Sequence, residues 1–381
     1  MYERLTREWN VVNDAEAKSL GGAWTRLGCL QQQLGNYKLA IVDHLQAQRI
    51  FDRLDFPKGK AAIFCNLGNA YYSLGDYQKA IGFHTQSMKI SQAISDESSI
   101  ASSLGGLGTA HYSLGNYQKA INLHSQSIKI KQAVGDINGI AVSLSNLGLA
   151  YYSLGDYQKA IDFHSQCLKV TQAIGSKHGI ASSLGGLGDS YTCLGSHQKA
   201  IDFHSQSIEI SEAIGDKSGI AGSLGSLGNA HYYLGNYKKA IKFQRQSLEI
   251  ERELGNCRDE ASSLWSLFQS YQQCGCLRRS MHYRHQAYRI WQDMRIPLAA
   301  TPLPVFLKNT AANMGETWAE QLIASEKSVA WFMLPIRYLL FALRTLLSPL
   351  TYLQKKLKIK PLWFWFCVGI AIVFLITWLK N

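Results

Sequence analysis

The phrase YYSLGDYQKAI occupies residues 71–81 and recurs without a change at residues 151–161. A near copy, YSLGNYQKAI, lies between them at residues 112–121. The dipeptides Leu-Gly and Ala-Ile keep the same 40-residue spacing from Leu34 to Ile241. A fixed period of this length is the sequence signature of a solenoid, in which each unit buries its apolar face against its neighbours.

Each 40-residue unit is predicted to form two helices joined by a tight turn. From residue 100 to residue 114, apolar and small residues follow one another at three- and four-residue steps, as on one face of a helix. Gly115 suits a left-handed helix end, and the small residues Gly108 and Ala120 suit a close helix crossing. An Asp, Asn or Ser side chain is expected to cap the helix that follows. This capping column consists of Asn36, Asp76, Asn116, Asp156, Ser196 and Asn236.

The pattern of small and large residues in each unit resembles that of tetratricopeptide repeats. The resemblance is carried by Leu67, Gly68, Tyr71, Ala80 and the columns of Ser87 and His84. The 40-residue length and the wording NLGNAYYSLGDYQKAI at residues 66–81 are similar to the longer class found in G-protein-regulator adaptors and many bacterial proteins. The resemblance implies an all-α fold, a right-handed α-solenoid of about seven helix-turn-helix units.

The resemblance covers residues 21–294. The predicted units lie at residues 21–60, 61–100, 101–140, 141–180, 181–220, 221–260 and 261–294. Residues 1–20 are expected to form a partial leading repeat or an N-terminal cap. The last unit replaces the Leu-Gly, Ala and Tyr columns by other residues, as a terminal cap does.

A column of histidines is the strongest candidate for catalysis or metal binding. It consists of His44, His84, His124, His164 and His204. Helices pack roughly 8–10 Å apart, so equivalent atoms in successive units are too far apart to share a zinc ion, whose ligands lie within about 2.1 Å. We therefore interpret the column as a buried, hydrogen-bonded ladder. With no CxxC pair and no phosphate-binding Gly-Lys motif, the sequence predicts no enzyme, metal site, cofactor or small-molecule substrate.

In tetratricopeptide arrays the first helix of each hairpin lines a concave groove, and the resemblance assigns groove positions to this chain. They are Asn66, Asn69, Tyr72, Gly106, Thr109, Tyr112, Asn146, Leu149, Tyr152, Asp189, Asn229 and Tyr232. Asparagine amides can clamp the backbone of an extended peptide, and tyrosines add broad contact area. The alternative is that these side chains only hydrate one face of a scaffold.

The groove positions carry no Lys or Arg. Relatives that grip the carboxylate end of chaperones depend on such cations, and nucleic acid requires a continuous basic track. Both partners are therefore disfavoured. The net charge of +12 does not change this interpretation, because residues 295–381 alone hold ten Lys or Arg against three Asp or Glu.

The last fifth of the chain departs from the repeat. Prolines after residue 294 predict a linker at residues 295–328. Residues 329–360 predict an amphipathic interfacial helix and a polybasic segment, with a second span at 329–353 as the alternative. Residues 361–381 predict a transmembrane tail anchor, because residues 362–379 carry no charge and would span about 27 Å as a helix. The basic residues expected at the membrane surface are Arg337, Arg344, Lys355, Lys356, Lys358 and Lys360.

Lysines directly before a span favour the cytoplasmic side. The sequence thus predicts a membrane-anchored, single-pass adaptor whose repeats face the cytoplasm and recruit a protein or peptide partner through the groove. The alternative is an assembly scaffold of a membrane complex that binds no exchangeable peptide ligand.

Overall fold

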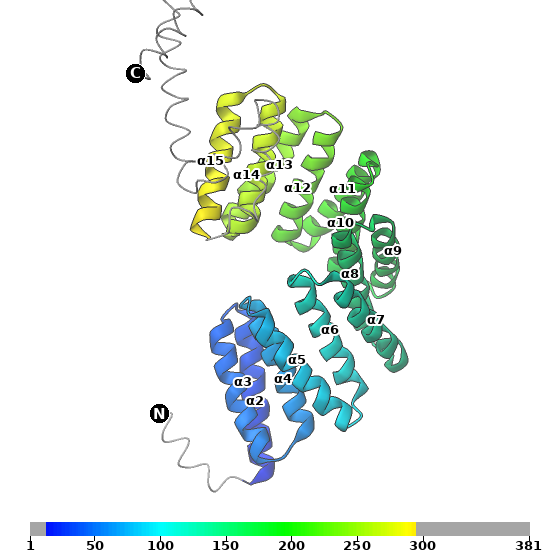
Figure 1. Cartoon of the computed structure of the whole chain (residues 1–381), viewed down its shortest axis with the longest axis vertical. Helices are drawn as coiled ribbons and strands as arrows, with labels where there is room; N and C mark the ends of the chain where they lie inside the picture. Colours follow the sequence, from blue (N-terminus) through cyan, green and yellow to red (C-terminus); the bar gives the residue numbers. More distant parts are fainter. Residues whose placement is uncertain (1–12, 295–381) are drawn as a thin grey trace, which may run out of the picture. The chain divides into compact units, whose positions relative to one another are not determined.

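The computed structural model describes residues 13–294, and every regular element in that range is an α-helix (Figure 1). Within this range fourteen helices form seven consecutive hairpins. The first helices of the hairpins are α2 (Asp14–Gln33), α4 (Pro57–Ser73), α6 (Glu97–Ser113), α8 (Ile137–Leu154), α10 (Lys177–Cys193), α12 (Lys217–Tyr233) and α14 (Cys257–Gln273). The second helices are α3 (Tyr37–Arg53), α5 (Tyr77–Ala93), α7 (Tyr117–Val134), α9 (Tyr157–Ala173), α11 (His197–Ile214), α13 (Tyr237–Leu254) and α15 (Leu277–Asp293).

Helices from α2 to α14 pack against their neighbours in chain order. First helices also contact the first helices of adjoining hairpins: α4 contacts α6, and α10 contacts both α8 and α12. The first helices therefore form a continuous layer. This arrangement confirms the all-helical solenoid predicted from the repeat.

Left-handed residues end the helices at both turns of the unit. Gly75 has a φ of 81°, and the backbone N–H of Asp76 donates to the carbonyl oxygen of Tyr71 at 2.9 Å. This bond satisfies a carbonyl group that the helix end would otherwise leave unpaired. At the second turn of the unit most positions are glycine, but Asp55 and Ser95 adopt φ values of 45° and 54°.

The predicted capping column is confirmed only where it holds aspartate. Asp76 and Asp156 each accept a hydrogen bond from the backbone N–H three residues later, at 3.2 Å. Asn36, Asn116, Ser196 and Asn236 form no such side-chain cap. Neutral side chains do cap helices at other turns, where Ser176 Oγ accepts from the backbone N–H of Gly179 and Asn256 Oδ1 accepts from that of Asp259.

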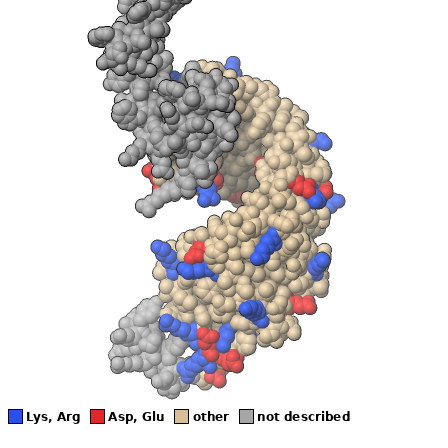
Figure 2. Space-filling view, in the orientation of Figure 1, with Lys and Arg blue, Asp and Glu red and all other residues tan. Residues whose placement is uncertain are grey.

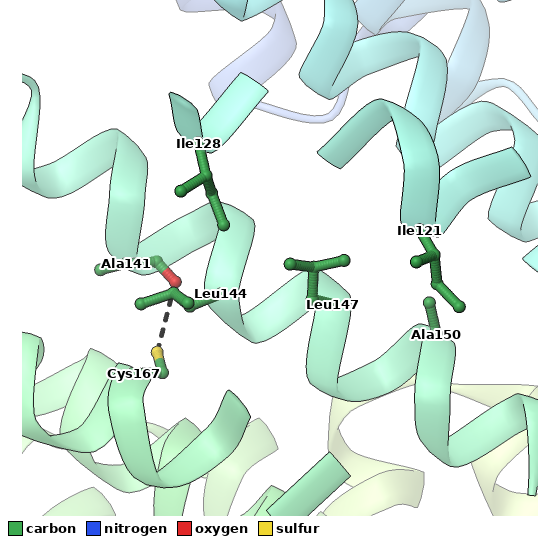
Figure 3. Close-up of a cluster of buried hydrophobic side chains, with 7 residues drawn as sticks. All are labelled: Ile121, Ile128, Ala141, Leu144, Leu147, Ala150 and Cys167. Carbon is green, nitrogen blue, oxygen red and sulfur yellow. Dashed lines mark hydrogen bonds between the residues drawn. The ribbon is translucent and has the colours of Figure 1, made fainter. Parts of the chain in front are cut away.

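Apolar residues from three consecutive helices form one cluster of the core (Figure 3). Its buried members are Ile121 and Ile128 from α7, Ala141, Leu144, Leu147 and Ala150 from α8, and Cys167 from α9. Full burial of one leucine contributes roughly 1.5–3 kcal/mol. Because each cluster joins two hairpins, no hairpin buries its apolar surface alone.

A column of small polar residues also ties the second helices α5, α7, α9 and α11 to the first helices of their hairpins. Ser87 Oγ donates to the carbonyl oxygen of Ala61 at 2.8 Å, and Ser127 Oγ donates to that of Ala101 at 2.8 Å. Cys167 occupies the same column, and its Sγ lies 3.2 Å from the carbonyl oxygen of Ala141 (Figure 3). The repeated Ser column is thus an internal packing feature.

No helix within residues 13–294 is long and apolar enough to cross a membrane. This finding corrects the localisation predicted from the sequence, a single span near the C-terminus with the repeats facing the cytoplasm. Helices in the described range have 17 to 20 residues and carry a polar face, as α2 and α3 do. The linker at 295–328, the interfacial segment at 329–360 and the anchor at 361–381 lie outside the described residues.

Candidate functional site

The predicted groove residues lie on α4, α6, α8, α10 and α12, in three columns with the 40-residue spacing. We call these columns the first-helix surface. It comprises residues 66, 106, 146, 186 and 226, residues 69, 109, 149, 189 and 229, and residues 72, 112, 152, 192 and 232. Asn69 and Leu149 are exposed, and the other predicted groove residues are half-buried.

The tyrosines of the third column hydrogen-bond to the next hairpin. The hydroxyl of Tyr72 lies 3.0 Å from Ser113 Oγ, and that of Tyr112 lies 2.9 Å from Ser153 Oγ. Each tyrosine ring also packs against a tyrosine of its own hairpin, as Tyr112 does against Tyr117 at 5.5 Å between centroids. The hydroxyls therefore connect neighbouring hairpins and are already partnered.

The asparagines of the surface differ in their availability. Asn66 Nδ2 lies 3.7 Å from Cys29 Sγ, and Asn229 Oδ1 accepts a hydrogen bond from Gln244 Nε2 at 3.1 Å. Asn69 is exposed, and neither it nor Asn146 forms a side-chain hydrogen bond within the described range. Asn69 and Asn146 are therefore the amides with full hydrogen-bonding capacity left for a partner.

The histidine column lies buried beneath the first-helix surface, with 0–2% of each residue exposed. Each of these imidazoles leaves Nδ1 without a hydrogen bond, so the prediction of a hydrogen-bonded ladder is wrong in this respect. The imidazole of His164, for example, packs between the backbones of Gly148 and Gly186. Burial lowers the pKa of His44, His84, His124 and His164 to about 4. At neutral pH these side chains are therefore uncharged.

Three predicted groove residues from three consecutive hairpins meet at one pocket of about 380 Å³. They are Tyr152 on α8, Asp189 on α10 and Asn229 on α12. The remaining lining residues are Thr192, Cys193, Gly195, His197, Ser226 and Tyr233. Thr192 and Ser226 belong to columns of the first-helix surface. The other four residues were not predicted as part of a site.

Two interactions between hairpins shape the pocket wall. Cys193 Sγ donates to the hydroxyl of Tyr152 at 3.3 Å, and the ring of Tyr233 stacks on that of His197 at 5.3 Å between centroids. Burial raises the pKa of Tyr152. The phenol therefore stays protonated and keeps a hydrogen to donate.

The sequence contains a signal for this pocket that differs from the regular groove columns. Where other units have YYSLGDY or a near copy, residues 191–197 are YTCLGSH. Thr192 replaces the tyrosine of the third column, Cys193 replaces serine, and His197 replaces tyrosine. These three changed positions all line the pocket. The substitutions in this repeat unit thus cluster around one pocket.

Asp189 is the one charged residue of the first-helix surface. On α6, α8, α10 and α12, every other Asp, Glu, Lys or Arg is the first residue of its helix. On the face visible in Figure 2, charged side chains likewise lie scattered between broad areas without charge. Asp189 therefore places an isolated carboxylate on a neutral surface.

Asp189 lies above a buried imidazole. Its Oδ1 is 3.6 Å from Nε2 of His204, and the carboxylate side chain remains 45% exposed. Burial lowers the pKa of His204, against the smaller opposing effect of Asp189. The imidazole is consequently neutral at pH 7 and does not balance the carboxylate. Within residues 13–294, no group of three or more His, Cys, Asp or Glu side chains could hold a metal ion.

Comparison with known proteins adds a family match. The model of the family described as Tetratricopeptide repeat matches the chain at residues 19–93, 59–133, 99–173, 139–213 and 179–253. These overlapping windows span more than half of the chain. No curated protein matches it by sequence.

The fold is similar to that of several solved structures. The apo form of the quorum sensor NprR from B. thuringiensis is 15% identical, with a TM-score of 0.61 over 76% of this chain and 80% of that one. A Rap protein complexed with competence and sporulation factor is 14% identical, with a TM-score of 0.60 over 77% of this chain and 80% of that one. The Rap conjugation gene regulator of plasmid pLS20, in complex with the Phr* peptide, is 18% identical, with a TM-score of 0.57 over 73% of this chain and 75% of that one. At these identities the likeness concerns the fold.

Proposed function

The chain belongs to the tetratricopeptide repeat family, and on that premise we propose that it is an adaptor that binds a protein or peptide partner. The partner binds along the first-helix surface. The observation that carries this proposal is the pocket at which Tyr152, Asp189 and Asn229 meet, because a partner lying there contacts three hairpins at once.

An extended peptide suits the spacing of this surface. Packed helices lie roughly 8–10 Å apart, and an extended chain advances about 3.3 Å per residue. One hairpin therefore corresponds to about three peptide residues. Asn69 and Asn146 each have an amide that can donate to and accept from a peptide backbone.

The solved structures support a peptide partner by analogy of fold. One of the similar proteins was solved with the Phr* peptide, and another with competence and sporulation factor. Those ligands belong to those proteins. For this chain they favour a binding function over a purely architectural one.

The test begins with selection of peptides from a random dodecapeptide phage library on the purified full chain. A selected peptide is then synthesised and titrated against variants by calorimetry. We expect Asn146→Ala to weaken binding about five- to hundred-fold, because a lost buried hydrogen bond costs about 1–3 kcal/mol.

Asn122→Ala provides the matched control, since Asn122 is an exposed asparagine on the second helix α7. Lys119→Ala on the same helix provides a second control. Both should bind as the parent does. If Asn146→Ala binds normally while the α7 variants lose affinity, the partner binds the second helices and the first-helix surface is not the site.

A further inference from the structure

The pocket between α8, α10 and α12 combines an acidic group with aromatic rings. Asp189 supplies the carboxylate, and Tyr152 and Tyr233 supply phenol rings. No Lys or Arg lines the pocket. A carboxylate without a neighbouring cation repels anionic ligands and attracts cationic ones.

The pocket owes its space to a substitution within the repeat. Tyrosine occupies the third column at residues 72, 112, 152 and 232, and Thr192 replaces it here. In other units the column tyrosine packs on the tyrosine five residues later, as Tyr152 does on Tyr157. In this unit the later residue is His197, and Tyr233 of the next hairpin stacks on it instead. The smaller Thr192 thus leaves the pocket of about 380 Å³, and Tyr233, at a position that holds serine in Ser73, Ser113 and Ser153, supplies part of its wall.

The polar groups of the pocket match a cation with several N–H donors. Asp189 has a second carboxylate oxygen, Oδ2, besides the one near His204. A carboxylate is the strongest acceptor that a protein offers to an ammonium or guanidinium group, and aromatic faces add a cation–π attraction. An apolar or acidic side chain would leave Asp189 partly covered and unpaired, which is costly.

We propose that this pocket receives the lysine or arginine side chain of a partner peptide, with the carboxylate of Asp189 as its counter-ion. The inference rests on the proposed function and specifies its partner as a peptide with a basic residue at one fixed position. Tyr152 and Tyr233 flank the aliphatic stem of that side chain and the charged group at its end.

The experiment compares dodecapeptide phage selections on the full-length parent chain and on Asp189→Asn. Asparagine is native at the equivalent Asn69 and Asn229, so this variant removes the charge while keeping a side chain that the repeat accommodates. The parent should enrich Lys or Arg at one position, and Asp189→Asn should lose that enrichment while keeping the preferences at other positions.

Affinities then provide a double-mutant cycle. On the parent, replacing the basic residue of a selected peptide by glutamine should weaken binding about ten- to hundred-fold, as expected for a charge-assisted hydrogen bond. On Asp189→Asn the same replacement should change affinity less than about three-fold. Thr192→Tyr restores the column residue, should narrow the pocket, and should also weaken binding of the basic peptide.

The outcomes separate this inference from the proposed function. If the parent selects peptides with no fixed basic position, or the glutamine replacement costs the same on both proteins, the cation pocket is wrong and the adaptor remains. If the parent selects no peptide at all, the adaptor and the cation pocket both fail. Circular dichroism and thermal unfolding of each variant show whether a loss of binding reflects loss of fold.

Discussion

The imidazole of His84 lies directly against the backbone of Gly68. A Cβ atom placed on Gly68 would lie 2.6 Å from both Cε1 and Nε2 of that ring, closer than real Cβ contacts occur. The same relationship holds for Gly28 and His44 and, with similar distances, in the later units. The repeated glycine therefore makes room for a specific buried ring.

Gly148→Ala should destabilise the protein. Its Cβ would lie 2.5 Å from Cε1 of His164, and Gly186 approaches the same atom from the adjoining hairpin, so the ring has no free direction. We expect a loss of about 1–3 kcal/mol in the free energy of unfolding, as for other overpacked cores. Urea denaturation measures it.

Gly222→Ala is the matched control for this substitution. Gly222 also lies within a first helix, α12, but a Cβ atom placed there would meet no side chain and no neighbouring helix within 4 Å. Alanine there should stabilise the helix by about 0.5–1 kcal/mol. Equal effects of the two substitutions would show that the imidazole does not restrict Gly148.

Acid should destabilise the solenoid through the histidine column. The folded pKa of His44, His84, His124 and His164 is about 4, below the ordinary value of 6.5. The unfolded chain therefore binds more protons between these values, and stability present above pH 6.5 is lost as pH falls toward 4. When the pH falls from 7 to 5.5, each of these histidines should lower the free energy of unfolding by about 1 kcal/mol.

The histidine contribution can be isolated by substitution. Gln244 occupies the column in the sixth unit, so glutamine is a residue that this position accommodates. His84→Gln should reduce the pH dependence of the unfolding free energy, and His84→Gln/His164→Gln should reduce it about twice as much. An unchanged pH dependence in both variants would contradict neutral burial as the cause.

Ser95→Gly should stabilise the protein. Ser95 holds a φ of 54° at a turn where Gly135, Gly175, Gly215 and Gly255 stand in other units. A left-handed conformation costs a non-glycine residue roughly 1–2 kcal/mol, partly offset by the greater freedom of glycine in the unfolded chain. We expect a net gain of about 0.5–1 kcal/mol in denaturant titrations.

The reverse exchange, Gly175→Ser, should lower stability by a similar amount. Gly175 has a φ of 68°, and no capping role distinguishes its turn from that of Ser95, since a side chain caps the next helix in both. If Ser95→Gly and Gly175→Ser shift stability in the same direction, backbone strain does not govern this turn.

The hairpins could be predicted because they depend on local features that the repeat displays many times. A glycine such as Gly75 marks a turn, and a three- and four-residue apolar pattern marks a helix face. Contacts between hairpins were harder to predict from the sequence. That the Tyr112 hydroxyl meets Ser153 depends on how one hairpin stacks on the next, which no residue spacing specifies.

The candidate site was predictable in part for the same reason. The family resemblance assigned Asp189 and Asn229 to the groove, yet Asn229 is partnered by Gln244. The changed phrase YTCLGSH was visible in the sequence, but only the structure brings Thr192 and His197 together with Tyr233 of the next hairpin around one pocket.

The third-column tyrosines were predicted to add contact area for a partner, and the structure shows that the hydroxyls of Tyr72 and Tyr112 pair with serines of the next hairpin. Tyr112→Phe removes the bond to Ser153 Oγ, 2.9 Å away, and keeps the ring on Tyr117. We expect a loss of about 0.5–1.5 kcal/mol in stability and little change in peptide affinity. Ser153→Ala removes the same bond. The double variant should therefore lose less unfolding free energy than the sum of the losses in the two single variants. If Tyr112→Phe instead weakens peptide binding as Asn146→Ala does while stability is unchanged, the hydroxyl serves the partner rather than the stacking of α6 on α8.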